Sequence, residues 1–312
     1  MTTLAEATET ELELNALKKF RAGHPDLFKK SDGQLLLHLG IVLSILALLT
    51  YASVESTFLP LKILFAAIAT FFWFSLVNVT IHHHTTHHNA AASPVLSKML
   101  DVLFYLVPAR KSRYIRAHLN HHARPFHDTD VDHRFGTERY LAVKHSPVKK
   151  VLYFLELTFV GSFIPGLTED TYLTEVPMDQ WNIDDYKAIM RRERRNAMLF
   201  SAGLWIAFFL AARWLPWFGW GWLFPMLMLK NWAHFLGQFQ HYDEQLLTEA
   251  DRSVWRRTRT FHVPGWFNYL TGGEISGHFV HHLFPQIPYY KVETARKQLM
   301  SDPELAKLFV HY

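Results

Sequence analysis

The chain has 312 residues, of which 49% are hydrophobic and 15% are aromatic, and its formal net charge is +4. It contains no cysteine, which excludes disulfides, thiolate metal sites and cysteine nucleophiles. The positive charge does not indicate a nucleic-acid partner, because the Lys and Arg residues collect in loops beside long apolar blocks.

Residues 1–33 precede the first apolar block. The run MTTLAEATETELELNALKK is acidic and then basic, and it lacks the apolar core and cleavage site of a signal peptide. Helix-breaking Gly, Pro and Asp residues follow in AGHPDLFKKSDG. We therefore expect a short amphipathic helix and a turn, which form an N-terminal segment in the cytoplasm or at the membrane interface.

Four apolar blocks are long enough to cross a hydrocarbon core of about 30 Å as helices that rise about 1.5 Å per residue. They are expected at residues 34–52, 57–79, 197–214 and 216–237. Short connections within each pair predict two hairpins. A large soluble helical core is the alternative, since its helices are also apolar. We favour an all-α integral membrane protein with four transmembrane helices and a cytoplasmic helical cap.

Lys and Arg residues are distributed unevenly between the two ends of these blocks. The segment YASVEST between the first two blocks contains neither, and the turn between the last two contains only Arg213. Basic residues crowd the opposite ends, at positions 18–30, 110–116, 191–195 and 252–259. Because short loops rich in Lys and Arg stay cytoplasmic, we expect both termini and all the large loops on that side of the membrane.

One more apolar stretch, residues 151–167, interrupts the polar region between the second and third blocks. Gly161 and Pro165 break it, and it is too short for a span. We expect a helix lying in the membrane interface there. The chain is thus divided into the N-terminal segment, residues 1–33, and one membrane domain, residues 34–312.

The chain contains 20 histidines, and most form three clusters on the expected cytoplasmic side. The first box is IHHHTTHHNA, the second is HLNHH and the third is HFVHH. Their histidines are His82, His83, His84, His87 and His88; His118, His121 and His122; and His278, His281 and His282. Residues three and four apart share one face of an α-helix, so the His-x-x-His-His spacing lets three imidazoles converge. Neutral imidazole is the commonest metal-ligating side chain.

A lone box of this kind also occurs by chance on a solvated helix face, or as a loose metal-sequestering tract. Three boxes on one side of a membrane indicate a metal site instead. Nitrogen ligands without thiolates suit iron and zinc alike. A His-rich metal transporter is a remote alternative, because it would need polar residues along the spans, and those present lie toward the span ends.

The three boxes, their order and the four-span plan resemble the membrane fatty acid desaturase superfamily, which includes desaturases, hydroxylases and decarboxylating enzymes. The third box with the following Leu-Phe-Pro285-Gln-Ile-Pro288-Tyr289 is similar to the third box of that family. The acidic residues that follow the second box are also similar. The resemblance covers roughly residues 35–300. It implies a membrane-bound, non-haem di-iron oxidoreductase with two iron ions as cofactor and O2 as co-substrate.

The resemblance also implies a ligand set. The expected ligands are His83, His87, His88, His118, His121, His122, His234, His278, His281 and His282. His234 lies at the end of the fourth expected span, where the family commonly has a further ligand, and His241 is its alternative. The register of the first box stays open, because His83 and His87 fit α-helical spacing and His84 and His88 fit it equally well. We favour His83 and His87, with His88 beside them, because they reproduce the family's His-x-x-x-His-His pattern.

Polar side chains near the boxes are expected to accept hydrogen bonds from metal-bound imidazoles and to fix their tautomers. The candidates are Asp128, Asp132, Asn231, Asp243 and Glu274. A solvated side chain beside basic loops is the alternative for each acid.

The resemblance implies O2-dependent oxidation of an unactivated C–H bond in a fatty acyl chain or another long-chain lipid. We favour desaturation, because the third box is most similar to that of desaturases. Hydroxylation and oxidative decarboxylation to a terminal alkene are the alternatives. Electrons are expected from a separate ferredoxin, rubredoxin or cytochrome with its reductase, because the chain has neither cysteines for an iron–sulfur cluster nor a glycine-rich dinucleotide motif.

Overall fold

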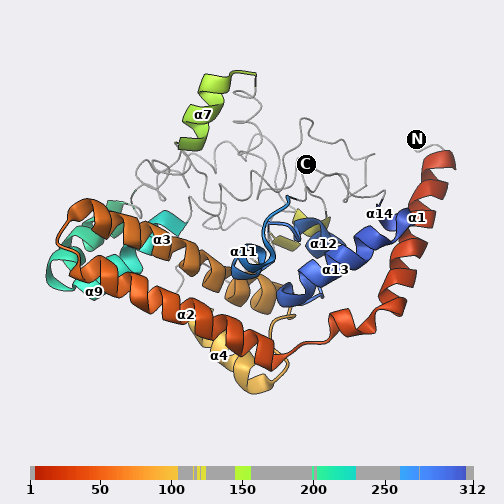
Figure 1. The fold of residues 1–312 in the computed structure, drawn as a ribbon, viewed down its shortest axis with the longest axis horizontal. Helices are drawn as coiled ribbons and strands as arrows, with labels where there is room; N and C mark the ends of the chain where they lie inside the picture. The colour runs from red at the N-terminus through yellow and green to blue at the C-terminus, as the bar shows by residue number, and fades with distance from the viewer. Residues whose placement is uncertain are drawn as a thin grey trace.

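The computed structural model describes residues 4–104, 115, 118–119, 121–123, 145–155, 199, 202–229, 261–273 and 275–306. Within these ranges every regular element is a helix, so the predicted all-α class is confirmed for the part of the chain described (Figure 1). Regular elements are spread from the N-terminal helix α1, Leu4–Gly23, to the short C-terminal helix α14, Pro303–Ala306.

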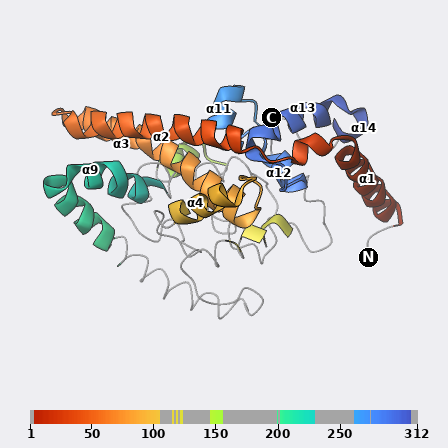
Figure 2. The same ribbon diagram turned by 90° about the horizontal axis from the view of Figure 1, so that it is seen from below.

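The longest elements are α2, Asp32–Glu55, and α3, Leu59–Val77, which lie side by side (Figures 1 and 2). Leu35, Leu39, Val42 and Leu46 form a buried stripe on α2 at the spacing of one helix face. They share a core with Ala69 and Leu76 of α3 and with Tyr289. This hairpin agrees with the first pair of expected spans.

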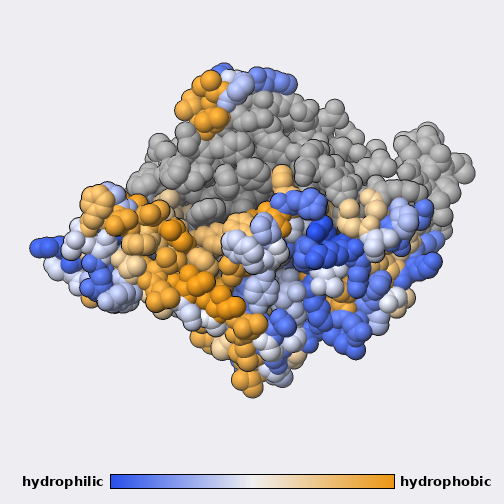
Figure 3. Space-filling model, in the orientation of Figure 1, coloured by the Kyte–Doolittle hydropathy of each residue, from blue (hydrophilic) through white to orange (hydrophobic). Residues whose placement is uncertain are grey.

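The outer surface of this hairpin is apolar. Large side chains such as Leu37, Leu48 and Leu64 are exposed along it. Figure 3 shows the apolar side chains gathered over α2 and α3, whereas the surface over α1 and α13 is mainly hydrophilic. Both α2 and the segment Leu59–Thr86 are long and apolar enough to cross a membrane. Because soluble monomers rarely expose large apolar areas, this surface indicates contact with lipid.

The second expected pair of spans is described only in part. Helix Ala202–Trp214 is apolar but shorter than the ~20 residues that a span needs. It is followed by α9, Pro216–Phe218, by the π-helix η6, Gly219–Leu223, and by helical residues 224–229. The rest of the expected spans at 197–214 and 216–237 lies outside the described residues, apart from residue 199. The crossing of the membrane by four helices therefore stays a prediction.

These helices pack against the hairpin through α3. A core cluster of Ala66, Phe208, Ala211, Phe224 and Leu227 joins the two parts. The indole Nε1 of Trp73 also donates a hydrogen bond of 2.9 Å to the carbonyl of Gly221. A Cβ atom at Gly221 would lie 2.6 Å from the Thr50 side chain, so only glycine allows η6 to approach α2 this closely.

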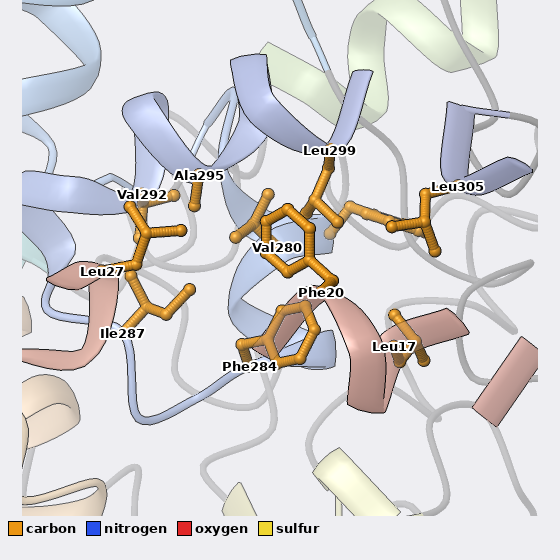
Figure 4. Packing of buried hydrophobic residues seen from close by; sticks show 11 residues of the cluster. Leu17, Phe20, Leu27, Val280, Phe284, Ile287, Val292, Ala295, Leu299 and Leu305 are labelled. Carbon is orange, nitrogen blue, oxygen red and sulfur yellow. The ribbon is translucent and has the colours of Figure 1, made fainter. Parts of the chain in front are cut away.

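The N-terminal segment forms a helix and a turn, as predicted. After α1, a short 3₁₀ helix, η1, spans Pro25–Phe28. Leu17, Phe20 and Leu27 are buried against residues of the C-terminal part, among them Phe284 and Leu299 (Figure 4). The two ends of the chain thus share one hydrophobic core.

The remaining elements are short. They are α4, Pro94–Phe104; α7, Pro147–Leu155; α11, Gly265–Leu270; α12, His278–Leu283; and α13, Tyr289–Ser301. The expected interfacial helix at 151–167 begins earlier, at Pro147, and residues 156–167 lie outside the described part. Val148, Val151 and Leu152 are exposed on α7, and its position in the interface stays a prediction.

Candidate metal centre

The first box lies on a π-helix, η2, Asn78–Thr86, which continues directly from α3. The amide of His87 bonds to the carbonyl of His82, five residues earlier, at 3.3 Å. In a π-helix each backbone N–H bonds to the carbonyl five residues earlier, which widens the turn relative to that of an α-helix. His82 and His87 therefore come to the same side, whereas the sequence argument assumed α-helical spacing.

Five histidines from all three boxes form one group, here called the five-histidine group. They are His82, His87, His118, His122 and His281, and one ring nitrogen of each lies within 4.8 Å of the others. The Nε2 atoms of His82 and His281 are 2.6 Å apart, and those of His281 and His122 are 2.9 Å apart. Nitrogens bound to one metal ion at about 2 Å lie about 3 Å from one another, so these separations fit shared ligation.

A second group, here called the three-histidine group, contains His121, His278 and His282, whose ligand atoms also lie within 4.8 Å of one another. The Nε2 atoms of His278 and His282, four residues apart on α12, are 3.1 Å apart. The two groups are adjacent, because the rings of His122 and His282 stack with centroids 4.3 Å apart. The arrangement fits two metal ions held side by side by nitrogen ligands.

Burial keeps two histidines of the five-histidine group, His118 and His281, in the ligating form. The pKa of His118 and the pKa of His281 lie well below the ordinary value of 6.5, first because burial disfavours the imidazolium and then because neighbouring histidines, His82 foremost, repel a second charge. Both rings are therefore neutral near pH 7. A neutral imidazole offers a lone pair to a metal ion without first losing a proton.

These lowered pKa values predict that the metal-free protein loses stability in acid. Below the unfolded pKa of about 6.5, the unfolded chain binds protons that folded His118 and His281 do not, so the free energy of unfolding rises with pH in this window. We expect the Tm of chelator-treated protein to fall as the pH is lowered below this value. Calorimetry across the window measures it, and a Gln substitution at both positions should flatten the slope. A Tm that rises on acidification would contradict the assignment.

The other first-box histidines lie outside both groups. The Nε2 of His83 donates a hydrogen bond of 2.8 Å to the carbonyl of Gly272. The Nε2 of His84 lies 3.5 Å from a carboxylate oxygen of Asp101 on α4. His88 has a positive φ of 52° after the end of η2. The structure thus places His82 in the five-histidine group, whereas α-helical spacing favoured His83 and His88 as ligands. The difference arises because α3 continues into a π-helix.

Several predicted site residues lie outside the described part of the chain. These are Asp128, Asp132, Asn231, His234, Asp243, Glu274 and the alternative ligand His241. Sequence reasoning missed Asn78 and Asn89, two buried amides that flank the first box and bond to carbonyls in the segments before and after the third. Their position next to the histidines was a signal, but their partners are backbone atoms, which leave no sequence pattern.

Comparison with known families gives one result. The family model described as fatty acid desaturase matches residues 57–312, a range that includes all three boxes. No curated protein gives a match.

Proposed function

The chain belongs to the fatty acid desaturase family, whose members are membrane di-iron oxidoreductases, and on this premise we propose that it uses two iron ions and O2 to desaturate a fatty acyl chain. The observation that supports the proposal most is the pair of adjacent histidine groups, drawn from three separate parts of the sequence. When bound, the iron ions supply O2 activation and C–H oxidation, which no amino-acid side chain can perform.

We assign one ion to the five-histidine group and the other to the three-histidine group. We further propose that His234 completes the smaller group, since it lies at the end of the fourth expected span in the sequence. The imidazoles of the two groups would hold the ions, and buried His118 and His281 stay neutral. Nitrogen donors alone also suit zinc, so iron rests on the family and not on the donor set.

The family implies a fatty acyl substrate, and the described helices place an apolar surface and the first box on one segment. The apolar segment Leu59–Thr86 carries the lipid-facing surface at one end and His82 at the other. We propose that an acyl chain approaches the histidines along this segment. Desaturation, as opposed to another oxidation, rests on the similarity of the third box to that of desaturases.

We propose four membrane crossings, with both termini and the centre in the cytoplasm, and a membrane domain at residues 34–312. Leu17 and Phe20 of the N-terminal segment pack against Leu299 near the C-terminus, which supports placing both segments on one side of the membrane. An even number of crossings is thus supported. We also propose a separate electron donor, a ferredoxin, rubredoxin or cytochrome with its reductase.

The function is tested by supplying a deuterated fatty acid and isotopically labelled dioxygen to cells that make the protein. We expect a product that is lighter by the mass of two abstracted hydrogen or deuterium atoms, that contains an internal double bond and that carries no label from dioxygen. Mass spectrometry of extracted lipids and hydrocarbons gives the answer. A labelled alcohol would indicate hydroxylation, and a terminal alkene lacking the carboxyl carbon would indicate decarboxylation. Cells making the His281→Ala variant are the control.

A further inference from the structure

The first box and its flanking residues do more than supply ligands to the five-histidine group. We propose that Asn78, His83 and Asn89, here called the clamp residues, are positioning residues that hold α12 in register against the first box. Each of these side chains donates a hydrogen bond to a backbone carbonyl in the chain that leads into α12 or leaves it. The metal-binding part of this inference rests on the proposed function, while the structural part does not.

Two clamp residues hold the chain before α12. The amide Nδ2 of Asn78 donates to the carbonyl of Thr271 at 3.1 Å, and Nε2 of His83 donates to the carbonyl of Gly272 at 2.8 Å. Gly272 has a φ of +72°, and a Cβ there would lie 2.8 Å from Nδ2 of Asn78. Glycine therefore provides both the turn and the close approach that these bonds require.

The third clamp residue holds the chain after α12. The Nδ2 of Asn89 donates to the carbonyl of Pro285 at 2.8 Å and to that of Ile287 at 3.0 Å. An amide nitrogen carries two hydrogens, and the two carbonyls use both. Asn89 is buried, with 1% of its surface exposed, so these bonds have little competition from water.

The hydrogen bonds of His83 give it a structural role, whereas His82 belongs to the five-histidine group. A carbonyl can only accept, so Nε2 of His83 must carry the proton, and its Nδ1 then faces Nδ2 of Asn89 at 3.3 Å. His82, the preceding residue, instead directs its Nε2 to that of His281 on α12. The two neighbouring histidines thus have different contacts: His82 contacts a side chain of α12, and His83 bonds to the backbone of the segment between α11 and α12.

The third box needs such support because α12 has only 6 residues. A helix this short is not stable by itself, so its position depends on what holds its two ends. His281 belongs to the five-histidine group, and His278 and His282 belong to the three-histidine group. A small rotation of α12 would therefore displace ligands from both groups at once.

The inference is tested with the full-length chain purified in detergent and loaded with iron. Asn89→Leu and His83→Ala remove clamp bonds, and we expect iron to pass to a chelator about 10–100-fold faster, as for other groups that orient metal ligands. Hydrogen exchange of the backbone amides at residues 277–287 should also become faster in metal-free protein. His83→Gln should restore slow exchange and slow iron release, because its amide can donate to Gly272 in place of the imidazole.

Thr80→Val is the matched control. Thr80 is as buried as Asn89 and lies in the same π-helix as His83, but its hydroxyl bonds to the carbonyls of Leu76 and Val77 at the end of α3 and not to the third-box region. This variant should leave the exchange at residues 277–287 near that of wild type. If Asn89→Leu does not fold, Asn89→Ser replaces it, since serine is small and too short to reach both carbonyls.

Two results would overturn the clamp. The first is that backbone amides of α12 exchange no faster in Asn89→Leu or Asn89→Ser than in the control Thr80→Val. The other is a His83→Gln variant that loses iron as fast as His83→Ala, which would make His83 a ligand. Hydrogen exchange is measured on metal-free protein, so it tests the clamp independently of the proposed function. A protein that binds zinc or oxidises no lipid would refute the proposed function but would not change the result for the clamp.

Discussion

Replacing His281 by alanine is expected to abolish lipid oxidation and to remove most of the bound iron. His281 is 1% exposed, and its Nε2 lies within 3.0 Å of Nε2 of both His82 and His122, at 2.6 and 2.9 Å. Loss of a residue that merely orients a ligand costs about 10–100-fold in affinity or activity, so loss of this ligand should cost at least about 100-fold.

The measurement pairs iron per chain, by elemental analysis, with product yield at equal protein level. His145→Ala is the control, because it makes the same chemical change at an exposed histidine outside both groups. Thermal unfolding of both variants separates lost ligation from lost folding. Turnover at the wild-type rate in His281→Ala would exclude this residue from the metal centre.

The helical hairpin could be predicted from the sequence because its signal is averaged over many residues. The expected spans at 34–52 and 57–79 correspond to Asp32–Glu55 and to α3 with its continuation into η2. An error of a few residues at either end hardly changes the mean hydropathy of such a block. The sequence also predicts that these two helices pack together, because helices joined by a short connection lie adjacent and antiparallel.

The first box could not be placed by the same reasoning, because its geometry depends on a helix type that composition does not reveal. Thr85 donates its hydroxyl hydrogen to the carbonyl of Thr80, five residues earlier, at 2.9 Å, which supports the wider turn. Asn78 and Asn89 hold the two ends of this segment against distant carbonyls. These contacts favour a π-helix only once the rest of the chain is folded, so no local pattern predicts them.

The second and third boxes were predicted as sets of three converging imidazoles, and the structure divides each set instead. His118 and His122 join the five-histidine group, whereas His121 joins the three-histidine group. On α12 the division is reversed, with His281 in the larger group and His278 and His282 in the smaller one. Positions three and four residues along a helix differ in direction by about 100°, so one box can contact two neighbouring ions.

The second large effect on iron content and turnover is expected from a substitution in the first box, where the ligand register is tested. Sequence spacing favoured His83, His87 and His88, but the π-helix brings His82 beside His87 in the five-histidine group. We therefore expect His82→Ala to lose iron and turnover about as severely as His281→Ala.

His88→Gly is the matched comparison within the same box, and we expect it to retain both iron and turnover. His88 lies outside both groups, and its φ of 52° is a conformation that glycine adopts without strain, so the substitution should not disturb the backbone. Iron per chain and product yield are measured on the two variants in parallel. If His88→Gly loses its iron while His82→Ala keeps it, the α-helical spacing describes the working enzyme, and His88 replaces His82 in the ligand set of the first box.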